Sequence, residues 1–574
     1  MTAELVLRWL LPLAVVLLAV AAARASGEGK GEGEGEGEGE IDHTNVRSAL
    51  ASRWAPVAAG VMSFALTWWA WGSLDQVPVV HDERAYVLQA GIFARGLWSV
   101  SAPALPEFFE QMHVLVTPSV AAKYPPGHAL LMTPGAWLGL PGLVPLLLDA
   151  ATGAMLFALA RRLTNPWVAA LSWLLWVATP SALAWRASYF SEVTTAALWL
   201  AGWWALLAWR ESHRWWWLAA LAAITAWGAI TRPLTMLAFA IPVAAVVLRD
   251  VVTRRAWRQL ALSTAVGTTL LAIVPLWSAR TTGDWRTTPL ARYTVDYLPF
   301  DKPGFGYDST PPRRALPRHL EGVSSQFAGY HRDHVPDSIP RTLVQRLERI
   351  VDDEWGGWRL GLLPFFALGI TAAGAAGALA LTSVVLLVAL YLLYAHPPVW
   401  TLYYLEAHAV LSFVTAAGVW RFVSHVAART AARGKDSADS RHAPHAAVAA
   451  LLLLLAALIP SALDARAARD SMARTRRYHE TVRPMLRSIP ESRTIVFVRH
   501  APGHSPHRSI VGNDPNPSNA RHWLVHDRGP DNHRLMRLAP ERVPYLLDEE
   551  AGTLTRGRPT LSHSSAVMSL DPRR

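Results

Sequence analysis

Acidic and basic side chains recur at the ends of long apolar runs in this sequence. Charge beside a membrane helix is costly unless it faces water or an opposite charge, so such positions are candidates for chemistry. A carboxylate can act as a general base toward a hydroxyl, and cations can stabilise a departing phosphate. Together, such groups could transfer a substituent from a phosphate ester to an acceptor. The residues of this kind are Asp82, Glu83, Lys123, Arg186, Glu192, Arg232, Arg280 and Glu406.

The elements that would position these side chains are membrane helices. The chain has 574 residues, of which 52% are hydrophobic, and its mean hydropathy is +0.20. A bilayer core about 30 Å thick needs roughly 20 apolar residues in helical form, and aromatic residues mark its two edges. Many runs approach that length, and the 27 tryptophans cluster at run ends, so we expect an all-α polytopic membrane protein. The apolar runs are 54–72, 143–160, 166–183, 192–209, 215–231, 233–249, 257–278, 359–373, 376–395, 404–422 and 444–463.

The loops rich in Lys and Arg predict the orientation, because such loops stay on the cytoplasmic side. These loops are 161–165, 210–214, 249–259 and 421–443. With these loops inside, successive loops alternate between the two sides of the membrane along the whole bundle, and the remaining loops lie outside. The outer segments would be 73–142, 184–191, the turn around 232, 279–358, 396–403 and 464–574.

The run 126–141 does not fit this alternation as a full span. It is short, and Pro134, Gly135 and Gly139 interrupt it. We therefore expect a helix lying in the outer interface, with a true membrane span as the alternative.

The composition divides the chain into four parts. A Gly/Glu repeat has nothing to bury and is expected to be disordered. The sequence RTIVFV at 493–498 predicts a buried strand in a small α/β domain after the last span. The predicted parts are an N-terminal apolar helix or signal-like segment (1–23), a linker (24–53), a transmembrane domain (54–464) with outer loops 73–142 and 279–358, and an extracytoplasmic C-terminal domain (465–574).

The segment that follows residue 81 has helical periodicity. Tyr86, Ala90, Phe93 and Leu97 share one face, which predicts an amphipathic helix on the bilayer surface. Its first turn contains Asp82 and Glu83, where the helix dipole favours carboxylates but their mutual repulsion does not. Such acids could be simple caps or part of a site.

Several other signals point away from particular classes of function. The chain has no cysteine, so disulfides and thiolate sites are excluded. Its net charge of +11 reflects arginines in short loops, so we expect no nucleic-acid partner.

Two parts of the sequence contain residue types that can bind a metal ion. The spacing of His500, His504 and His507 could suggest a metal, but the segment is rich in Pro and Gly, so no metal site is predicted there. No cofactor is certain, and Asp82 and Glu83 could hold a divalent cation or none.

Several motifs in order resemble the GT-C membrane glycosyltransferases. They are HDERAYVLQAG from residue 81, KYPPGHALLMTPG from residue 123, ARRLTNPWVAALSWLLWVATPSALAWRASYFSEVTTAALWL from residue 160, and the Arg-Pro pair at 232–233 before a long outer loop. The resemblance covers roughly 54–425 and is nearest to protein mannosyltransferase-like (glycosyltransferase family 39) and aminoarabinose transferase-like members. It implies a GT-C fold with about 11–13 transmembrane helices.

The resemblance also implies roles for individual residues. Asp82 would be the catalytic base with Glu83 beside it, Lys123 would contact the lipid phosphate, and Glu192 would be a further acid of the site. Relatives often place an Arg before a late pair of tyrosines, whereas this chain has Thr401 and Leu402 there. Arg232 or Arg280 could replace that phosphate contact. The side chains expected to line the site are His81, Tyr86, Tyr124, His128, Tyr189, Glu192 and Glu406.

Together these features predict a glycosyltransferase of the cell (inner) membrane with an extracytoplasmic site. It would move a sugar from a polyprenyl-phosphate donor to a protein, lipid or glycan acceptor in one inverting displacement. The alternative is a transporter or flippase for lipid-linked glycans, which predicts inverted repeats and ionisable groups near the middle of the membrane.

Overall fold

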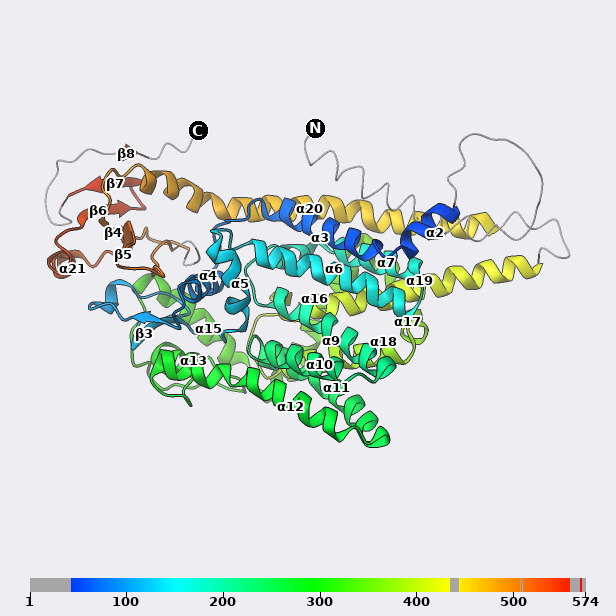
Figure 1. Cartoon of the computed structure of the whole chain (residues 1–574). Coiled ribbons are helices and arrows are strands. Elements are labelled where there is room, and N and C mark those ends of the chain that lie inside the picture. The colour runs from blue at the N-terminus through cyan, green and yellow to red at the C-terminus, as the bar shows by residue number, and fades with distance from the viewer. Residues whose placement is uncertain (1–42, 434–442, 506, 508, 558–567, 570–574) are drawn as a thin grey trace.

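The computed structural model describes residues 43–433, 443–505, 507, 509–557 and 568–569. Long helices run side by side through the molecule, and the shorter elements gather at one end of this bundle (Figure 1). Five helices in the described ranges are long and apolar enough to cross a membrane, or six if the pair bent by 73° between Pro166–Val177 and Pro180–Arg186 is one span. This organisation is that of a multi-pass membrane protein.

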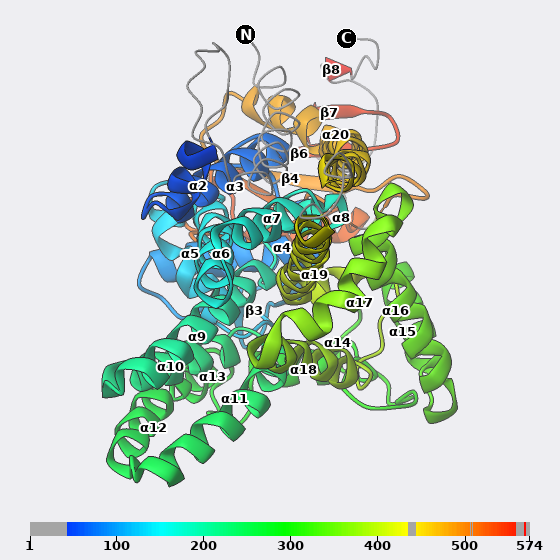
Figure 2. The same ribbon diagram turned by 90° about the vertical axis from the view of Figure 1, so that its right-hand side faces the viewer.

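Each predicted apolar run falls on one or two helices, because long uncharged stretches satisfy their backbone internally as helix. Viewed along the bundle, α10 lies between α9 and α12, and α19 lies between α7 and α17 (Figure 2). The bundle helices are α3 (Ala55–Trp71), α6 (Leu143–Leu163), α7 (Pro166–Val177), α8 (Pro180–Arg186), α9 (Glu192–Ser212), α10 (Trp215–Ala229), α11 (Pro233–Arg254), α12 (Trp257–Leu271), α13 (Ile273–Thr282), α17 (Leu363–Ala372), α18 (Gly374–Tyr391), α19 (Leu405–Arg433) and α20 (Ala443–Arg487).

The segment 73–142 folds into two helices and a small sheet. Strand β3 (Ser119–Ala122) lies between β1 (Val100–Ser101) and β2 (Val114–Leu115), with antiparallel pairing on both sides. Helix α4 (His81–Ala94) packs against β3 and against α5 (Gly127–Trp137). At 11 residues, α5 is about 16 Å long and too short to cross a bilayer.

The prediction for α4 was wrong in one respect. Tyr86, Ala90 and Phe93, which were expected to face the bilayer, are buried in the protein, together with Glu83 and Gln89 on other sides of the helix. Leu97 lies beyond the end of α4 and is exposed. The helix is enclosed by its neighbours instead of resting one face on the bilayer surface. A single apolar stripe could not reveal the strands and loops that cover the remaining faces.

The segment 279–358 forms three further helices. They are α14 (Pro289–Tyr297), α15 (Glu321–Asp333) and α16 (Ile339–Trp355), with the short 3₁₀ helix η2 (Arg318–Leu320) immediately before α15. Helix α14 contacts β2, so this segment meets the segment 73–142 at the same end of the bundle.

The C-terminal part is a small α/β unit, as predicted. Strand β4 (Thr494–Arg499) is parallel to both β5 (His522–His526) and β6 (Val543–Asp548), and β7 (Thr553–Arg556) and β8 (Met568–Ser569) extend the sheet antiparallel. Helix α21 (Asn532–Leu538) lies between β5 and β6 in the sequence. Aromatic contacts join this unit to the segment 73–142, with Phe108 against Phe497 and Phe109 against Trp523.

Two predicted boundaries differ from the structure. Helix α20 continues through residue 464, so no break separates the last apolar run from the C-terminal unit. Within the predicted linker 24–53, helix α2 (His43–Ala51) forms where the Gly/Glu repeat has ended. The predicted N-terminal helix 1–23 lies outside the described residues.

Candidate functional site

A cavity of about 350 Å³ opens where the segments 73–142 and 279–358 meet the bundle. Acids and bases that are far apart in the sequence lie on its wall. The predicted site residues among its lining are His81, Asp82, Tyr86, Lys123, Tyr124, Glu192 and Arg232.

Asp82 lies in the first turn of α4 and faces this cavity. Its carboxylate accepts a short hydrogen bond from the Tyr124 hydroxyl, and its Oδ2 lies 3.6 Å from Nε2 of His113. Burial raises the pKa of Asp82, but the positive charge that His113 carries when protonated at acidic pH, the Tyr124 hydroxyl and the Lys123 charge outweigh that effect and hold it below its usual value. Asp82 is therefore ionised at neutral pH, with its side chain 35% exposed to the cavity.

His113 is a neutral neighbour of this carboxylate. Burial, followed by the positive charge of Lys123, lowers its pKa to about 3. The imidazole is consequently uncharged at neutral pH. Sequence reasoning missed His113, because its position beside Asp82 depends on the fold of the strand segment.

Glu83 faces away from the cavity. Its Oε2 accepts from the backbone N–H of Val79 (2.7 Å) and Val80 (3.2 Å), and its Oε1 accepts from Tyr189 N–H (2.9 Å). This is the capping arrangement that satisfies free N–H groups at a helix start. One of the two adjacent acids is thus a cap, and only Asp82 lines the cavity.

Lys123 forms an ion pair that the sequence did not predict. Its Nζ lies 3.3 Å from Oδ2 of Asp301, and the two side chains are only 5% and 9% exposed. The ammonium also lies over the rings of Tyr124 and Tyr293, at 5.3 and 5.1 Å. Burial raises the pKa of Asp301, but Lys123 and then His331 lower it well below its usual range, so the Asp301 carboxylate is ionised at neutral pH.

Arg232 forms the second buried ion pair of the cavity. Its Nη1 lies 2.7 Å from Oε1 of Glu192, and its Nη2 donates to the Tyr391 hydroxyl at 2.5 Å. The two side chains come from the N-terminal ends of two helices, because Glu192 is the first residue of α9 and Arg232 is the N-cap of α11. The guanidinium also stacks over Tyr403, one of the late pair of tyrosines.

The remaining predicted residues lie elsewhere. Glu406 accepts a short hydrogen bond from Thr195, and His128 contacts Thr194 Oγ1 and the Tyr189 carbonyl, both deeper in the bundle. The Arg280 side chain is exposed near the end of α13. The structure therefore places five of the predicted residues outside the lining of the cavity: Glu83, His128, Tyr189, Arg280 and Glu406.

Most of the remaining wall is aromatic or apolar. Such a wall suits a ligand with a hydrophobic or ring-shaped part, whereas the ion pairs offer charged contacts at the same place. His507, from the C-terminal unit, completes the wall beside His81, with ring centroids 5.3 Å apart. The aromatic lining residues not predicted from the sequence are Trp185, Phe190, Phe327, Tyr391, Tyr394, Trp400 and Tyr403.

Comparison with known proteins supports part of the predicted relationship. A model of the dolichyl-phosphate-mannose-protein mannosyltransferase family matches residues 141–278. The match confirms the predicted resemblance to GT-C glycosyltransferases over that segment. No curated protein matches the sequence.

Two solved structures align with much of this chain at low sequence identity. The crystal structure of ArnT from Cupriavidus metallidurans bound to undecaprenyl phosphate aligns over 87% of this chain and 90% of that chain, with 15% identity and a TM-score of 0.49. The oligosaccharyltransferase AglB from Archaeoglobus fulgidus, in complex with an inhibitory peptide and a dolichol-phosphate, aligns over 78% of this chain and 63% of that chain, with 11% identity and a TM-score of 0.40.

Proposed function

We propose that this protein is a membrane glycosyltransferase that takes a sugar from a polyprenyl-phosphate donor. The observation that carries the proposal is the cavity, where Asp82 lies on the same wall as Lys123 and Arg232. The aromatic wall suits the sugar and the first prenyl units, and the cations suit the phosphate. The family match over residues 141–278 supports the same class of enzyme.

In the proposed reaction, Asp82 accepts the proton of an acceptor hydroxyl or amine. The oxygen or nitrogen then attacks the anomeric carbon, and the bond from that carbon to the phosphate oxygen breaks. The electron pair leaves with polyprenyl phosphate, which Lys123 and Arg232 stabilise. A single displacement inverts the anomeric centre, and no nucleotide takes part.

The hydrogen bond from Tyr124 suits Asp82 to this role. It fixes the orientation of the carboxylate, while the lowered pKa keeps the carboxylate ionised and ready to accept a proton. We propose that the acceptor reaches Asp82 along the part of the wall that His81 and His507 form.

Both cations are already paired with carboxylates, so the donor phosphate must compete with Asp301 and Glu192. Binding of the phosphate would then loosen the contact between the segments 73–142 and 279–358 and the contact between α9 and α11.

The site would face the extracytoplasmic side of the cell (inner) membrane, in accordance with the arginine-rich loops at the other helix ends. The helical bundle with the segments 73–142 and 279–358 would form the transferase domain, and the sheet that follows α20 would be the extracytoplasmic domain. This orientation places the cavity where a flipped lipid donor presents its headgroup.

Transfer of labelled sugar from polyprenyl phosphate, measured in membranes, tests the proposal. Asp82→Asn should reduce the transfer rate by about 10²–10⁴-fold, because the amide cannot accept the proton. Asp75→Asn is the matched control, since Asp75 is exposed before α4 and bonds only locally to Ser73. Equal rates for wild type and Asp82→Asn would remove Asp82 from catalysis, and lipid translocation without transfer would favour a transporter.

A further inference from the structure

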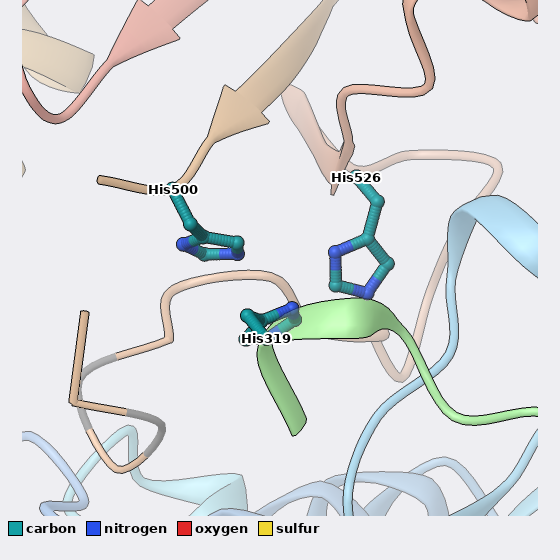
Figure 3. Close-up of side chains that lie close together, drawn as sticks. All are labelled: His319, His500 and His526. Atoms are coloured by element: carbon teal, nitrogen blue, oxygen red, sulfur yellow. The ribbon is translucent and has the colours of Figure 1, made fainter. Parts of the chain in front are cut away.

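Four histidines and a glutamate from distant parts of the chain lie together at one edge of the C-terminal sheet. His500 follows β4, His526 ends β5 and Glu549 follows β6. These three strands are parallel neighbours, so their carboxyl ends meet, as they do at the ligand sites of other parallel sheets. His319, from η2 of the segment 279–358, closes the cluster from the opposite side (Figure 3).

The rings of the cluster approach closely. The centroid of His500 lies 4.0 Å from that of His319 and 4.4 Å from that of His504. His319 lies 4.9 Å from His526. One ligand nitrogen from each of His319, His500 and His526 lies within 4.8 Å of the others. In Figure 3 the three side chains surround one small space.

Several ring nitrogens of the cluster are buried without a hydrogen-bond partner. These atoms are Nε2 of His319, His500 and His504. His526 bonds the Glu110 carbonyl through Nε2 at 2.8 Å, which makes Nε2 the protonated nitrogen and leaves Nδ1 with a free lone pair. Buried polar atoms normally have partners, so three unpartnered ring nitrogens in one place, beside Nδ1 of His526, point to a missing ligand.

Glu549 sets the tautomer of two of these rings. Its Oε1 lies 3.1 Å from Nδ1 of His500, and its Oε2 lies 2.7 Å from Nδ1 of His504. A neutral imidazole that donates from Nδ1 presents an unprotonated Nε2. This carboxylate–histidine pairing is the usual support behind a metal-binding histidine.

We propose that His319, His500 and His526 bind one Zn²⁺ ion, with His504 as the fourth ligand. Imidazole nitrogen is a preferred Zn²⁺ ligand, and four protein ligands in a tetrahedron are typical of structural zinc sites. Tetrahedral Zn–N bonds place ligand nitrogens about 3.3 Å apart, so small rotations of His319, His500 and His526 would close these three around the ion. His504, which lies with His500 and Glu549, would turn its Nε2 toward the ion to complete the set. Glu549 orients the ligands without being one.

The ion would fasten the C-terminal unit to the segment 279–358. Helix α15 begins two residues after His319 and supplies Val323 and Phe327 to the wall of the cavity. On the other side of the cluster, the loop that follows His504 carries His507 to the same wall. The proposed zinc therefore has a structural role that supports the shape of the cavity from outside it.

The spacing of the histidines in the sequence did not predict this metal site. His500, His504 and His507 lie in a Pro/Gly-rich stretch that cannot by itself hold a tetrahedron, and His507 indeed turns to the cavity. The missing ligands come from β5 and from a segment about 180 residues earlier in the chain.

The test is the metal content of the full-length protein, purified in detergent through a tag that contains no histidine. Elemental analysis after Zn²⁺ addition and washing should give about one zinc per chain, and cobalt substitution should give the visible spectrum of a tetrahedral site. His319→Ala and His526→Ala should lose most of the bound zinc. Glu549→Gln should retain the site but weaken zinc affinity by about 10–100-fold.

His533→Ala is the matched control, because His533 is exposed in the same unit and lies outside the cluster. Wild-type protein that stays free of zinc and gives no tetrahedral cobalt spectrum would overturn the proposal and leave His500 and His504 as ion-pair partners of Glu549. Full zinc content in both alanine variants would also overturn it. The cobalt spectrum of wild type decides the question if those variants do not fold, and metal content is independent of whether the transferase proposal holds.

Discussion

Asp82 and Glu83 are adjacent in the sequence, but their carboxylates have different surroundings. Glu83 satisfies backbone N–H groups at the start of α4, whereas Asp82 faces the cavity with a tyrosine hydroxyl and a neutral histidine beside it. The division follows from helix geometry, because consecutive side chains point about 100° apart.

Removing the Tyr124 hydroxyl should move the pH dependence of transfer. That hydrogen bond lowers the pKa of Asp82, so Tyr124→Phe should raise it. A base is active above its pKa, so the acid limb of kcat/KM against pH should shift to higher pH in the variant. Tyr307→Phe, at an exposed tyrosine outside the cavity, should leave the limb in place. An unchanged limb in Tyr124→Phe would separate Tyr124 from the proton transfer.

The Lys123–Asp301 pair allows a structural role to be separated from a functional one. Lys123→Met leaves a buried carboxylate without its cation and should cost about 3–5 kcal/mol of stability as well as most of the activity. Adding Asp301→Asn should restore much of the thermal stability in detergent but not the transfer. Recovery of transfer in the double variant would show that Lys123 does not contact the donor.

At the scale of elements, the start of α5 is docked on the turn that carries Arg232. Gly127 N–H donates to the Ile230 carbonyl at 2.9 Å, and a Cβ at Gly127 would lie 2.3 Å from Thr231 Oγ1 and 2.9 Å from the Ile230 carbonyl oxygen. The absence of a side chain thus lets α5 hold that turn in place.

Gly127→Ala should therefore destabilise the protein by about 1–3 kcal/mol and reduce transfer, since the turn must move away from α5. Thermal unfolding in detergent and the transfer assay would measure both effects. Gly322→Ala, in α15 where an added methyl group meets open space, should have neither effect. A wild-type unfolding temperature for Gly127→Ala would mean that the turn adapts without cost.

Hydropathy was sufficient to predict which stretches of the sequence form the helices of the bundle, because a membrane helix is recognised by its length and its lack of charge. It also located the acids and bases near helix ends. It could not pair them: Asp301 lies in a polar loop without periodicity, and its contact with Lys123 depends on how the segment 279–358 folds back. The same is true of His507 and His319, whose places are set by contacts between remote segments.

On the scale of the whole molecule, the orientation in the membrane can be tested directly. The chain contains no cysteine, so single cysteines can be introduced without a background. In intact cells, an impermeant thiol reagent should label Ser309→Cys, in an exposed loop near the cavity end, and should not label Arg214→Cys. Disruption of the cells should expose both. Labelling of only Arg214→Cys in intact cells would place the cavity on the cytoplasmic side.

The contact between the C-terminal unit and the segment 73–142 is an apolar cluster. Phe108 and Phe497 are fully buried in it and lie edge to face, with ring centroids 6.3 Å apart. Phe497→Ala should cost about 3–5 kcal/mol and make the C-terminal unit more sensitive to limited proteolysis. Leu538→Ala, at a side chain that is 53% exposed, should not change the digestion pattern. Equal proteolysis of the two variants would show that the units are held mainly by other contacts.

Helix α20 runs for 45 residues, about 67 Å, along the bundle and ends just before the C-terminal sheet (Figure 1). Deleting one residue from such a rod would swing everything beyond it through about 100° and draw it back by about 1.5 Å. Insertion of seven residues would return the C-terminal sheet to within about 20° of its original orientation about the helix axis, but two turns farther along that axis. The number of residues between 443 and 487 therefore sets the orientation of the C-terminal sheet relative to the bundle.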